Sequence, residues 1–119
     1  MSAITGKVWG TTENILTTPM VELHRIRVVS NSQCSLHRHD HKWNGFYVLS
    51  GSLIIEAHKN EYDLVDRTVL TAGQFTSIPP GELHRFVCES PAVALELYWI
   101  DGINPMDIVR EDVGGLNDI

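Results

Sequence analysis

The sequence lacks several features that would define its class at once. Its 119 residues contain only two cysteines, Cys34 and Cys88, too few for a disulfide scaffold, and so predict a reducing, cytoplasmic location. Basic residues are scarce: nine lysines and arginines against fifteen acidic residues give a net charge of −6, which argues against a nucleic-acid partner. No apolar run approaches the roughly 18 residues that cross a bilayer, and the N-terminus does not resemble a signal peptide. We therefore expect a soluble protein without a membrane partner.

Helical periodicity is also missing, because no segment keeps apolar residues at helical spacing over three turns. Short β-rich runs separated by turn residues take its place. Gly51 supplies a tight turn, from which we expect a hairpin of residues 46–57. Many short strands without a long helix predict a single all-β domain over residues 1–119, a sandwich or barrel with its core near residues 20–100. The expected strands cover residues 21–29, 46–49, 53–57, 64–70, 75–78, 84–88 and 93–100.

The C-terminal segment differs in composition from the rest of the chain. Residues 101–119 carry five acidic side chains and one basic side chain, Arg110. Glycines and Pro105 interrupt the segment, and residues 106–112 have room for one helical turn. A partly ordered acidic tail and a segment docked on the barrel are both consistent with this pattern.

Histidines recur at every second position of one short segment, at His37, His39 and His41. Side chains two apart on a strand share a face, so we expect the three imidazoles to point the same way. Inside a barrel such a cluster is costly unless water, hydrogen bonds or a metal satisfies its nitrogens. Because imidazole binds zinc, copper, iron and nickel, the segment indicates a metal site, with a solvent-facing strand edge as the alternative.

A second segment supplies a further histidine. A short strand after Gly73 ends at Pro79, Pro80 and Gly81, and His84 opens the next strand. Proline fixes φ and glycine permits unusual backbone angles, so we expect a turn that returns the chain antiparallel. His84 is then expected to face inward as another metal ligand.

Together the two segments resemble the paired motifs of the cupin superfamily, whose barrels are double-stranded β-helices, or jelly rolls. In the first motif His37 and His39 take the histidine positions and Gly51 the glycine position, while Asn44 stands where a glutamate is expected. The resemblance covers roughly residues 20–100.

The second cupin motif is matched by Gly73, Pro79, Gly81 and His84, with Cys88 in place of its asparagine. The resemblance implies a jelly-roll barrel and a divalent metal ion, with zinc, manganese, iron and nickel as the candidates.

Asn44 leaves the ligand set open. Cupin centres usually combine three histidines with the glutamate, and an asparagine brings no negative charge. The candidates are therefore His37, His39 and His84 with either the amide oxygen of Asn44 or His41 as a fourth ligand. A three-histidine site with open positions, as in some cupin dioxygenases, and a barrel that has lost its metal are also consistent with the sequence.

The C-terminal half resembles the cupin domain of type II mannose-6-phosphate isomerases, through the turn before His84 and Arg85 and through residues 95–97 and 107–114. This resemblance implies that residues 101–119 pack on the barrel. Sugar-phosphate isomerisation needs a base, a polarising metal and a cationic phosphate clamp. The resemblance makes Arg85, Arg110 and Asn44 the candidate substrate contacts, although Arg85 follows His84 on its strand and is expected on the opposite face.

Glu96 is the candidate catalytic residue. It lies in the middle of an expected strand and alternates with Leu95 and Leu97. If it faces inward, it is a buried carboxylate that needs a partner, and it becomes a candidate general base or a replacement for the missing glutamate. The alternative is an outward side chain on a solvated sheet face.

Our leading hypothesis is a small metal-binding cupin that binds or converts a small polar metabolite, such as a sugar or sugar phosphate, by isomerase- or epimerase-type chemistry. A three-histidine iron dioxygenase is the first alternative, and a non-catalytic small-molecule-binding cupin is the second. We also expect a homodimer, because cupins commonly pair their sheets and residues 21–29 would offer a strand edge.

Overall fold

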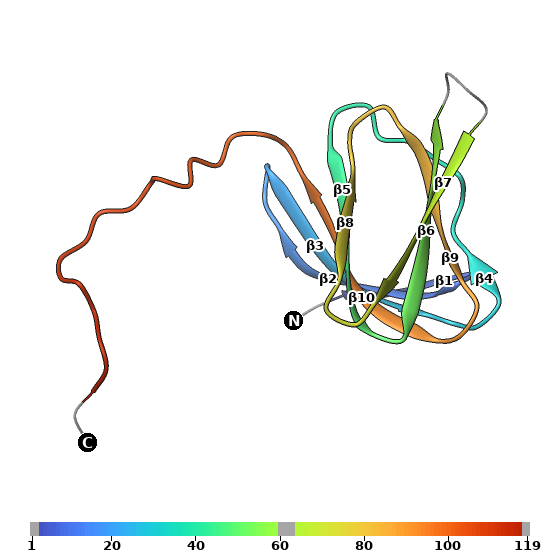
Figure 1. Ribbon diagram of the computed structural model, residues 1–119, viewed down its shortest axis with the longest axis horizontal. Coiled ribbons are helices and arrows are strands. Elements are labelled where there is room, and N and C mark those ends of the chain that lie inside the picture. The colour runs from blue at the N-terminus through green and yellow to red at the C-terminus, as the bar shows by residue number, and fades with distance from the viewer. Residues whose placement is uncertain (1–2, 60–63, 118–119) are drawn as a thin grey trace.

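A computed structural model describes residues 3–59 and 64–117 of the chain. Those residues form strands, turns and loops, with no helix among them (Figure 1). The strands are β1 (Ala3–Lys7), β2 (Gly10–Thr17), β3 (Val21–Val28), β4 (Ser32–Gln33), β5 (Trp43–Ser50), β6 (Ser52–Lys59), β7 (Leu64–Thr71), β8 (Phe75–Ile78), β9 (Leu83–Cys88) and β10 (Ala92–Trp99). The described part of the chain thus holds no helix that is long and apolar enough to span a membrane.

The strands form two antiparallel sheets that face each other (Figure 1). The larger sheet has the strand order β1-β2-β3-β10-β5-β8, and the smaller sheet has the order β4-β9-β6-β7. From β3 onward each strand is followed by a strand of the other sheet, except that β7 follows β6 within the smaller sheet, and this alternation is typical of a double-stranded β-helix. The all-β jelly roll expected from the sequence is confirmed.

The core fills the space between the sheets with inward-facing side chains, most of them from β3, β5, β6, β9 and β10. Phe86 of β9 packs edge-on against Trp9, with ring centroids 4.9 Å apart, and lies 6.1 Å from Phe46 of β5. Asn44 lies two positions before Phe46 on its strand, and His84 lies two positions before Phe86, so these polar side chains face inward as well. The polar site therefore begins where the aromatic core ends.

The turn at Gly51 joins two sheets, so the expected hairpin of residues 46–57 is wrong. β5 pairs with β10 and β8, whereas β6 pairs with β7 and β9. Gly51 itself adopts the positive φ that a tight turn needs, 75°, and a side chain there would clash with the backbone of Pro91. The local turn was predictable, but the partners of its two strands depend on contacts distant in sequence.

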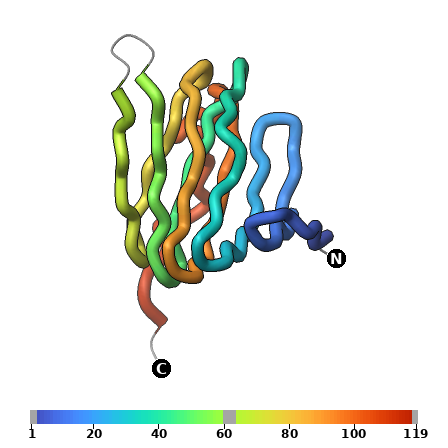
Figure 2. The backbone as a smooth tube through the Cα atoms, turned by 90° about the vertical axis from the view of Figure 1, so that its right-hand side faces the viewer, coloured from blue at the N-terminus to red at the C-terminus, as the bar shows by residue number. Residues whose placement is uncertain are grey.

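The N-terminal residues extend the larger sheet beyond the strands expected from the sequence. β1 and β2 pair with each other, and β2 also pairs with β3. Figure 2 shows these blue strands standing at one side of the barrel. β3 lies between β2 and β10, so it does not offer the free edge expected of residues 21–29.

The acidic C-terminal segment leaves the barrel after β10 and runs away from it (Figure 1). Residues 101–117 are exposed throughout. The amide of Asp107 donates to the carbonyl of Asn104 at 3.0 Å, which forms a turn in place of a helical turn at residues 106–112. The structure therefore does not place this segment, with Arg110, on its own barrel.

Candidate metal centre

Backbone hydrogen bonds tie the two histidine segments together. His37 and His84 exchange N–H to carbonyl hydrogen bonds of 3.0 and 2.8 Å, although His37 belongs to a loop rather than to a strand. The amide of Gly81, where φ is 86°, donates to the carbonyl of His39 at 2.8 Å. The turn before β9 thus holds the loop that carries His37 and His39 against the strand that carries His84.

The structure brings His37, His39 and His84 together as one group, here called the histidine triad. One nitrogen of each imidazole lies within 4.8 Å of the other two. The ring centroids of His84 and His37 are 4.8 Å apart, and those of His84 and His39 are 5.5 Å apart. His84 is buried and the other two are half-buried, so the triad is partly accessible to solvent.

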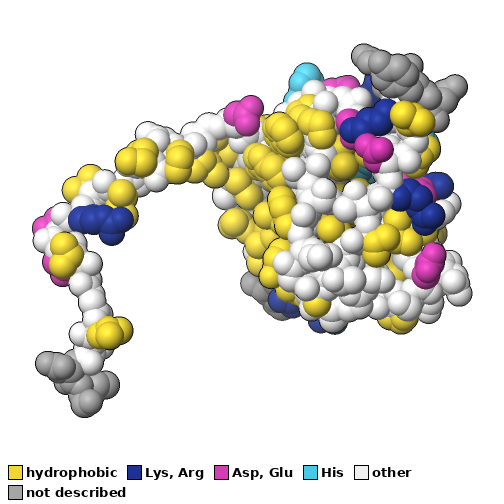
Figure 3. Space-filling model, viewed as in Figure 1, with side chains coloured by type: hydrophobic (Ala, Val, Ile, Leu, Met, Phe, Trp, Pro, Cys, Tyr) yellow, Lys and Arg dark blue, Asp and Glu magenta, His cyan; other side chains and the backbone are white. Residues whose placement is uncertain are grey.

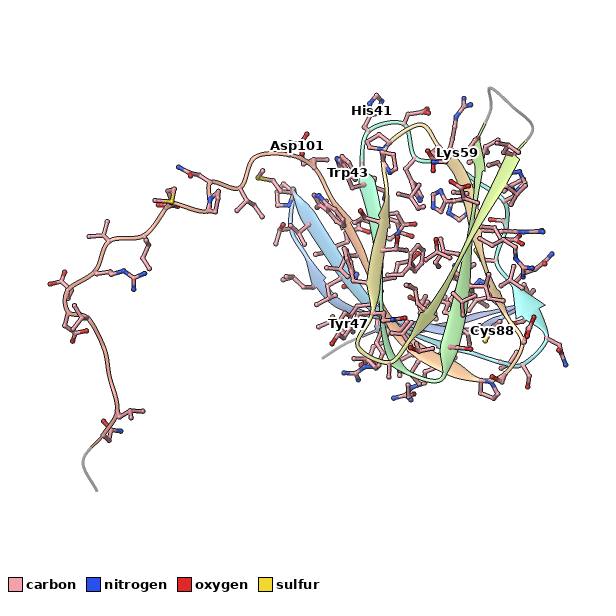
Figure 4. The ribbon with its side chains drawn as sticks, in the orientation of Figure 1. His41, Trp43, Tyr47, Lys59, Cys88 and Asp101 are labelled. Atoms are coloured by element: carbon pink, nitrogen blue, oxygen red, sulfur yellow. The ribbon has the colours of Figure 1, made fainter. Side chains whose placement is uncertain are left out.

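His41 does not join the triad. The chain bends at Asp40 and His41, and His41 is exposed at the tip of the loop before β5 (Figure 4). The period-two argument assumed an extended strand across all three histidines, and this bend breaks that strand. We therefore remove His41 from the candidate ligands.

Hydrogen bonds fix the tautomers of two triad members. Nδ1–H of His37 donates to the carbonyl of Ser35 at 2.8 Å, and Nδ1–H of His84 donates to the carbonyl of Glu82 at 2.8 Å. In a neutral imidazole the other nitrogen, Nε2, then carries a free lone pair. Burial lowers the pKa of His84, so its ring is neutral at pH 7.

His39 is the least satisfied member of the triad. Its Nε2 atom is buried without a hydrogen-bond partner among the described residues. Burial, and then the neighbouring His37, Lys42 and His84, lower the pKa of His39 to about 4. The ring is therefore uncharged at neutral pH, and its buried Nε2 atom is unsatisfied.

Asn44 takes the position next to the triad, where the sequence motif has a glutamate. Its Nδ2 donates to the carbonyl of Leu97 at 3.2 Å and to Oε2 of Glu96 at 3.4 Å, which turns Oδ1 toward the triad. Oδ1 lies 2.9 Å from Nε2 of His84. Because Nδ1 holds the proton of the neutral His84 ring, two acceptors face each other here with no proton between them. A cation between these atoms would satisfy both of them, and neutral nitrogen and oxygen donors are suitable ligands for a divalent metal ion.

Glu96 faces inward, so the outward orientation on a solvated sheet face is wrong. Its side chain is buried on β10, next to Asn44 and Tyr98. Burial raises the pKa of Glu96, and hydrogen bonds from Tyr98 and Asn44 oppose this rise. The carboxylate of Glu96 thus lies behind Asn44, whose amide group separates it from the triad.

A cavity of about 680 Å³ opens beside the triad. His37 and Glu96 line it, together with four residues that the sequence analysis did not select: Glu22, His24, Lys42 and Tyr98. Glu22 and His24 share the inner face of β3 with Ile26, because side chains two apart on a strand point the same way. The sequence did not show which face of β3 points inward, since that depends on its partner strands. Tyr98 lies two residues after Glu96 on β10 and so shares its face, and this spacing could have identified Tyr98 from the sequence.

The two candidate phosphate-binding arginines lie outside the cavity. Arg85 points to the outer face of the smaller sheet, as its alternation with His84 indicated, and its Nε donates to Oε1 of Glu56 at 2.7 Å. Arg110 is exposed in the segment that runs away from the barrel. Neither side chain lines the cavity in this structure.

Comparisons with known proteins agree with this fold. The chain is similar to KdgF from Halomonas sp., with 15% identity, 84% of this chain and 87% of that chain covered, and a TM-score of 0.71. It is also similar to oxalate decarboxylase from Bacillus subtilis (15% identity, 83% and 27% covered, TM-score 0.72). The capsular polysaccharide assembling protein CapF from Staphylococcus aureus is a third match (16% identity, 90% and 30% covered, TM-score 0.73). At these identities the matches establish the fold alone.

The chain spans less than a third of the oxalate decarboxylase and CapF chains. No curated protein sequence matches it. The family model for the cupin domain matches residues 24–101, which include the whole histidine triad, Asn44 and Glu96. On its sequence motifs, its jelly-roll fold and this match, the chain belongs to the cupin family.

Proposed function

We propose that this cupin binds one divalent metal ion through the histidine triad, with Oδ1 of Asn44 as a fourth ligand. The observation that carries the proposal is the convergence of unsatisfied atoms: Nε2 of His39 is buried without a partner, and Nε2 of His84 faces Oδ1 of Asn44 with no proton between them. A cation would satisfy these atoms at once. The backbone carbonyls that hold Nδ1 of His37 and His84 support this role, because metal-binding histidines usually donate their other ring N–H to such a partner.

The substrate site is the adjoining cavity, and its occupant is a small polar metabolite. The bound metal would polarise an oxygen atom of that molecule. Glu96 reaches the cavity as a buried carboxylate with a raised pKa, which suits a group that accepts and returns a proton. We therefore propose proton-transfer chemistry of the isomerase or epimerase type, with Glu96 as the general base.

A sugar phosphate is not the substrate that this cavity favours. The phosphate clamp inferred for Arg85 and Arg110 has no support, because Arg85 is engaged with Glu56 and Arg110 is exposed on the C-terminal segment. A polar metabolite without a phosphate group fits the lining better.

An iron-dependent dioxygenase is the second candidate. The observation that favours it is the neutral donor set, since three histidines and an amide bring no carboxylate to the metal. Iron in the purified protein together with oxygen consumption would support the dioxygenase, whereas zinc, manganese or nickel without oxygen consumption would support proton-transfer chemistry. The absence of any stoichiometric metal would leave a non-catalytic binding protein.

The test of the metal centre is metal binding by histidine variants. We expect the wild-type protein to bind one divalent ion per chain in calorimetric titrations, and His39→Ala to abolish that binding because it removes the unsatisfied ligand. His41→Ala is the matched control, since this exposed histidine lies on the same loop outside the triad. Full metal occupancy in His39→Ala, or equal losses in both variants, would contradict the proposed ligand set.

A further inference from the structure

The charged groups that line the cavity are not all compensated by one another. Glu22 is paired with His24 at 3.3 Å, and Glu96 accepts a hydrogen bond from Asn44 at 3.4 Å. Lys7 and Lys42 line the same cavity. Among the described residues, no carboxylate lies within ion-pair distance of Lys42, whereas Lys59 on β6 is 2.9 Å from Glu82.

Lys42 is held beside the triad by Tyr98. Its Nζ lies 4.1 Å from the centroid of the Tyr98 ring, and that ring lies 5.1 Å from the His39 ring. The face of an aromatic ring attracts an ammonium group but does not neutralise it. Burial, with the nearby Glu96, raises the pKa of Tyr98, so the ring stays uncharged. Lys42 thus presents an uncompensated positive charge at the edge of the metal centre.

We propose that Lys42 binds a carboxylate group of the ligand and that this cupin acts on a small organic acid. The proposal rests on the proposed function, because the same molecule must reach the triad from the cavity. Charge-assisted hydrogen bonds to a carboxylate replace the hydrogen bonds to water that an ammonium group loses when a ligand covers it.

The surroundings of Lys42 favour a carboxylate over a phosphate. Phosphate sites usually combine guanidinium groups or the N–H groups at a helix N-terminus. The described residues include no helix, and no arginine lines the cavity. The volume of about 680 Å³ suits a small metabolite and is too small for a macromolecular partner.

The test compares organic acids with phosphate and with a neutral polyol. Malonate, malate, pyruvate, inorganic phosphate and erythritol are titrated by calorimetry into the full-length protein, both metal-free and saturated with zinc. We expect at least one of the three acids to bind, and Lys42→Met to weaken its binding about ten- to a hundredfold, as a lost charge-assisted hydrogen bond would. Lys42→Arg keeps the charge and should retain most of the affinity. Lys59→Met is the matched control, because Lys59 is engaged with Glu82 and lies outside the cavity.

The outcomes separate this proposal from the metal centre. Zinc titration of Lys42→Met should give the wild-type stoichiometry, and thermal melts check that the variant is folded. If zinc binds but Lys42→Met holds the organic acids as tightly as wild type, the role of Lys42 is wrong while the metal centre stands. If zinc does not bind but the Lys42-dependent acid binding persists in the metal-free protein, the metal centre is wrong and the acid site stands. Tighter, Lys42-dependent binding of phosphate, or no binding of any of the three acids at millimolar concentration, would overturn the proposed ligand class.

Discussion

Asn44 sets the charge of the candidate metal centre. Its amide is held by the Leu97 carbonyl and by Glu96, so its oxygen rather than its nitrogen faces the triad. Where the cupin motif has a carboxylate in contact with the metal, this chain has a neutral amide with the Glu96 carboxylate behind it. The negative charge thus lies on the neighbouring Glu96 of β10 and not at the ligand position itself, which leaves Glu96 available to a ligand in the cavity.

The substitution Asn44→Asp tests this displacement because it restores a carboxylate without changing the size of the side chain. We expect zinc to bind more tightly, by up to about a thousandfold, since two unit charges about 4 Å apart interact with on the order of 4 kcal/mol at an effective dielectric constant of 20 and each 1.4 kcal/mol is a factor of about ten. The metal-free variant should unfold about 1–3 kcal/mol more easily, because the Leu97 carbonyl loses its donor and two carboxylates become neighbours. Calorimetry and urea unfolding measure the two effects.

Asn44→Ala serves as the control for that prediction. It removes the amide without adding charge, so zinc binding should weaken and the gain seen with aspartate should be absent. Equal zinc affinities in the aspartate variant and the wild type would show that Asn44 does not contact the metal.

At the scale of the elements, the turn between β8 and β9 positions the ligands. Gly81 adopts a φ of 86° and donates to the carbonyl of His39. Gly81→Ala should lower the free energy of unfolding by about 1–2 kcal/mol, because an L side chain is strained in this left-handed conformation even though no neighbour blocks it. Urea unfolding measures the change.

Gly6→Ala is the matched control for the turn. Gly6 lies in β1 without a positive φ, and no atom lies within 4 Å of the side chain it would gain. We expect its stability to stay within about 0.5 kcal/mol of wild type. A similar loss in both variants would show that the effect comes from removing a glycine and not from the turn.

The local elements of this fold could be predicted from the sequence, whereas their partners could not. Turn residues and β-rich runs predicted most strands and the positive φ of Gly51. They did not show that this turn crosses between sheets, because that depends on pairing between β5 and β10 or β6 and β9. β1 was missed because its polar and glycine residues give no alternating pattern.

The candidate site was predictable to the same extent. His37, His39 and His84 could be predicted because their spacing matches the two cupin motifs, and the structure brings them together. His41 was added by assuming a continuous strand, and a bend in the loop moves it away. Lys42 was missed because nothing in its immediate sequence shows that Tyr98, far along the chain, lies beneath its ammonium group.

At the scale of the whole molecule, the outer face of the larger sheet is apolar where it meets the start of the C-terminal segment (Figure 3). Trp43 and Trp99 stack with ring centroids 6.0 Å apart, and Phe75 lies beside Trp99 with half of its surface exposed. Gly45 has no side chain between them, since an added Cβ would lie 2.7 Å from Phe75 and 2.8 Å from Trp99. Tyr47 extends the exposed surface along β5 (Figure 4).

A second copy of the chain is the partner that we expect on this face. Monomeric proteins rarely expose a contiguous patch of large apolar side chains, and residues 21–29 offer no free strand edge for pairing. Light scattering at micromolar concentration should therefore give a molecular mass that is twice the mass of one chain, which is 13.4 kDa. Phe75→Ser should shift the mass toward the monomer, because it removes a half-exposed aromatic ring from the patch. Val69→Ser, at an equally exposed apolar position on β7 of the other sheet, should leave the dimer intact. A wild-type mass near that of one chain would rule out the dimer, and dissociation by Val69→Ser alone would place its interface on the smaller sheet.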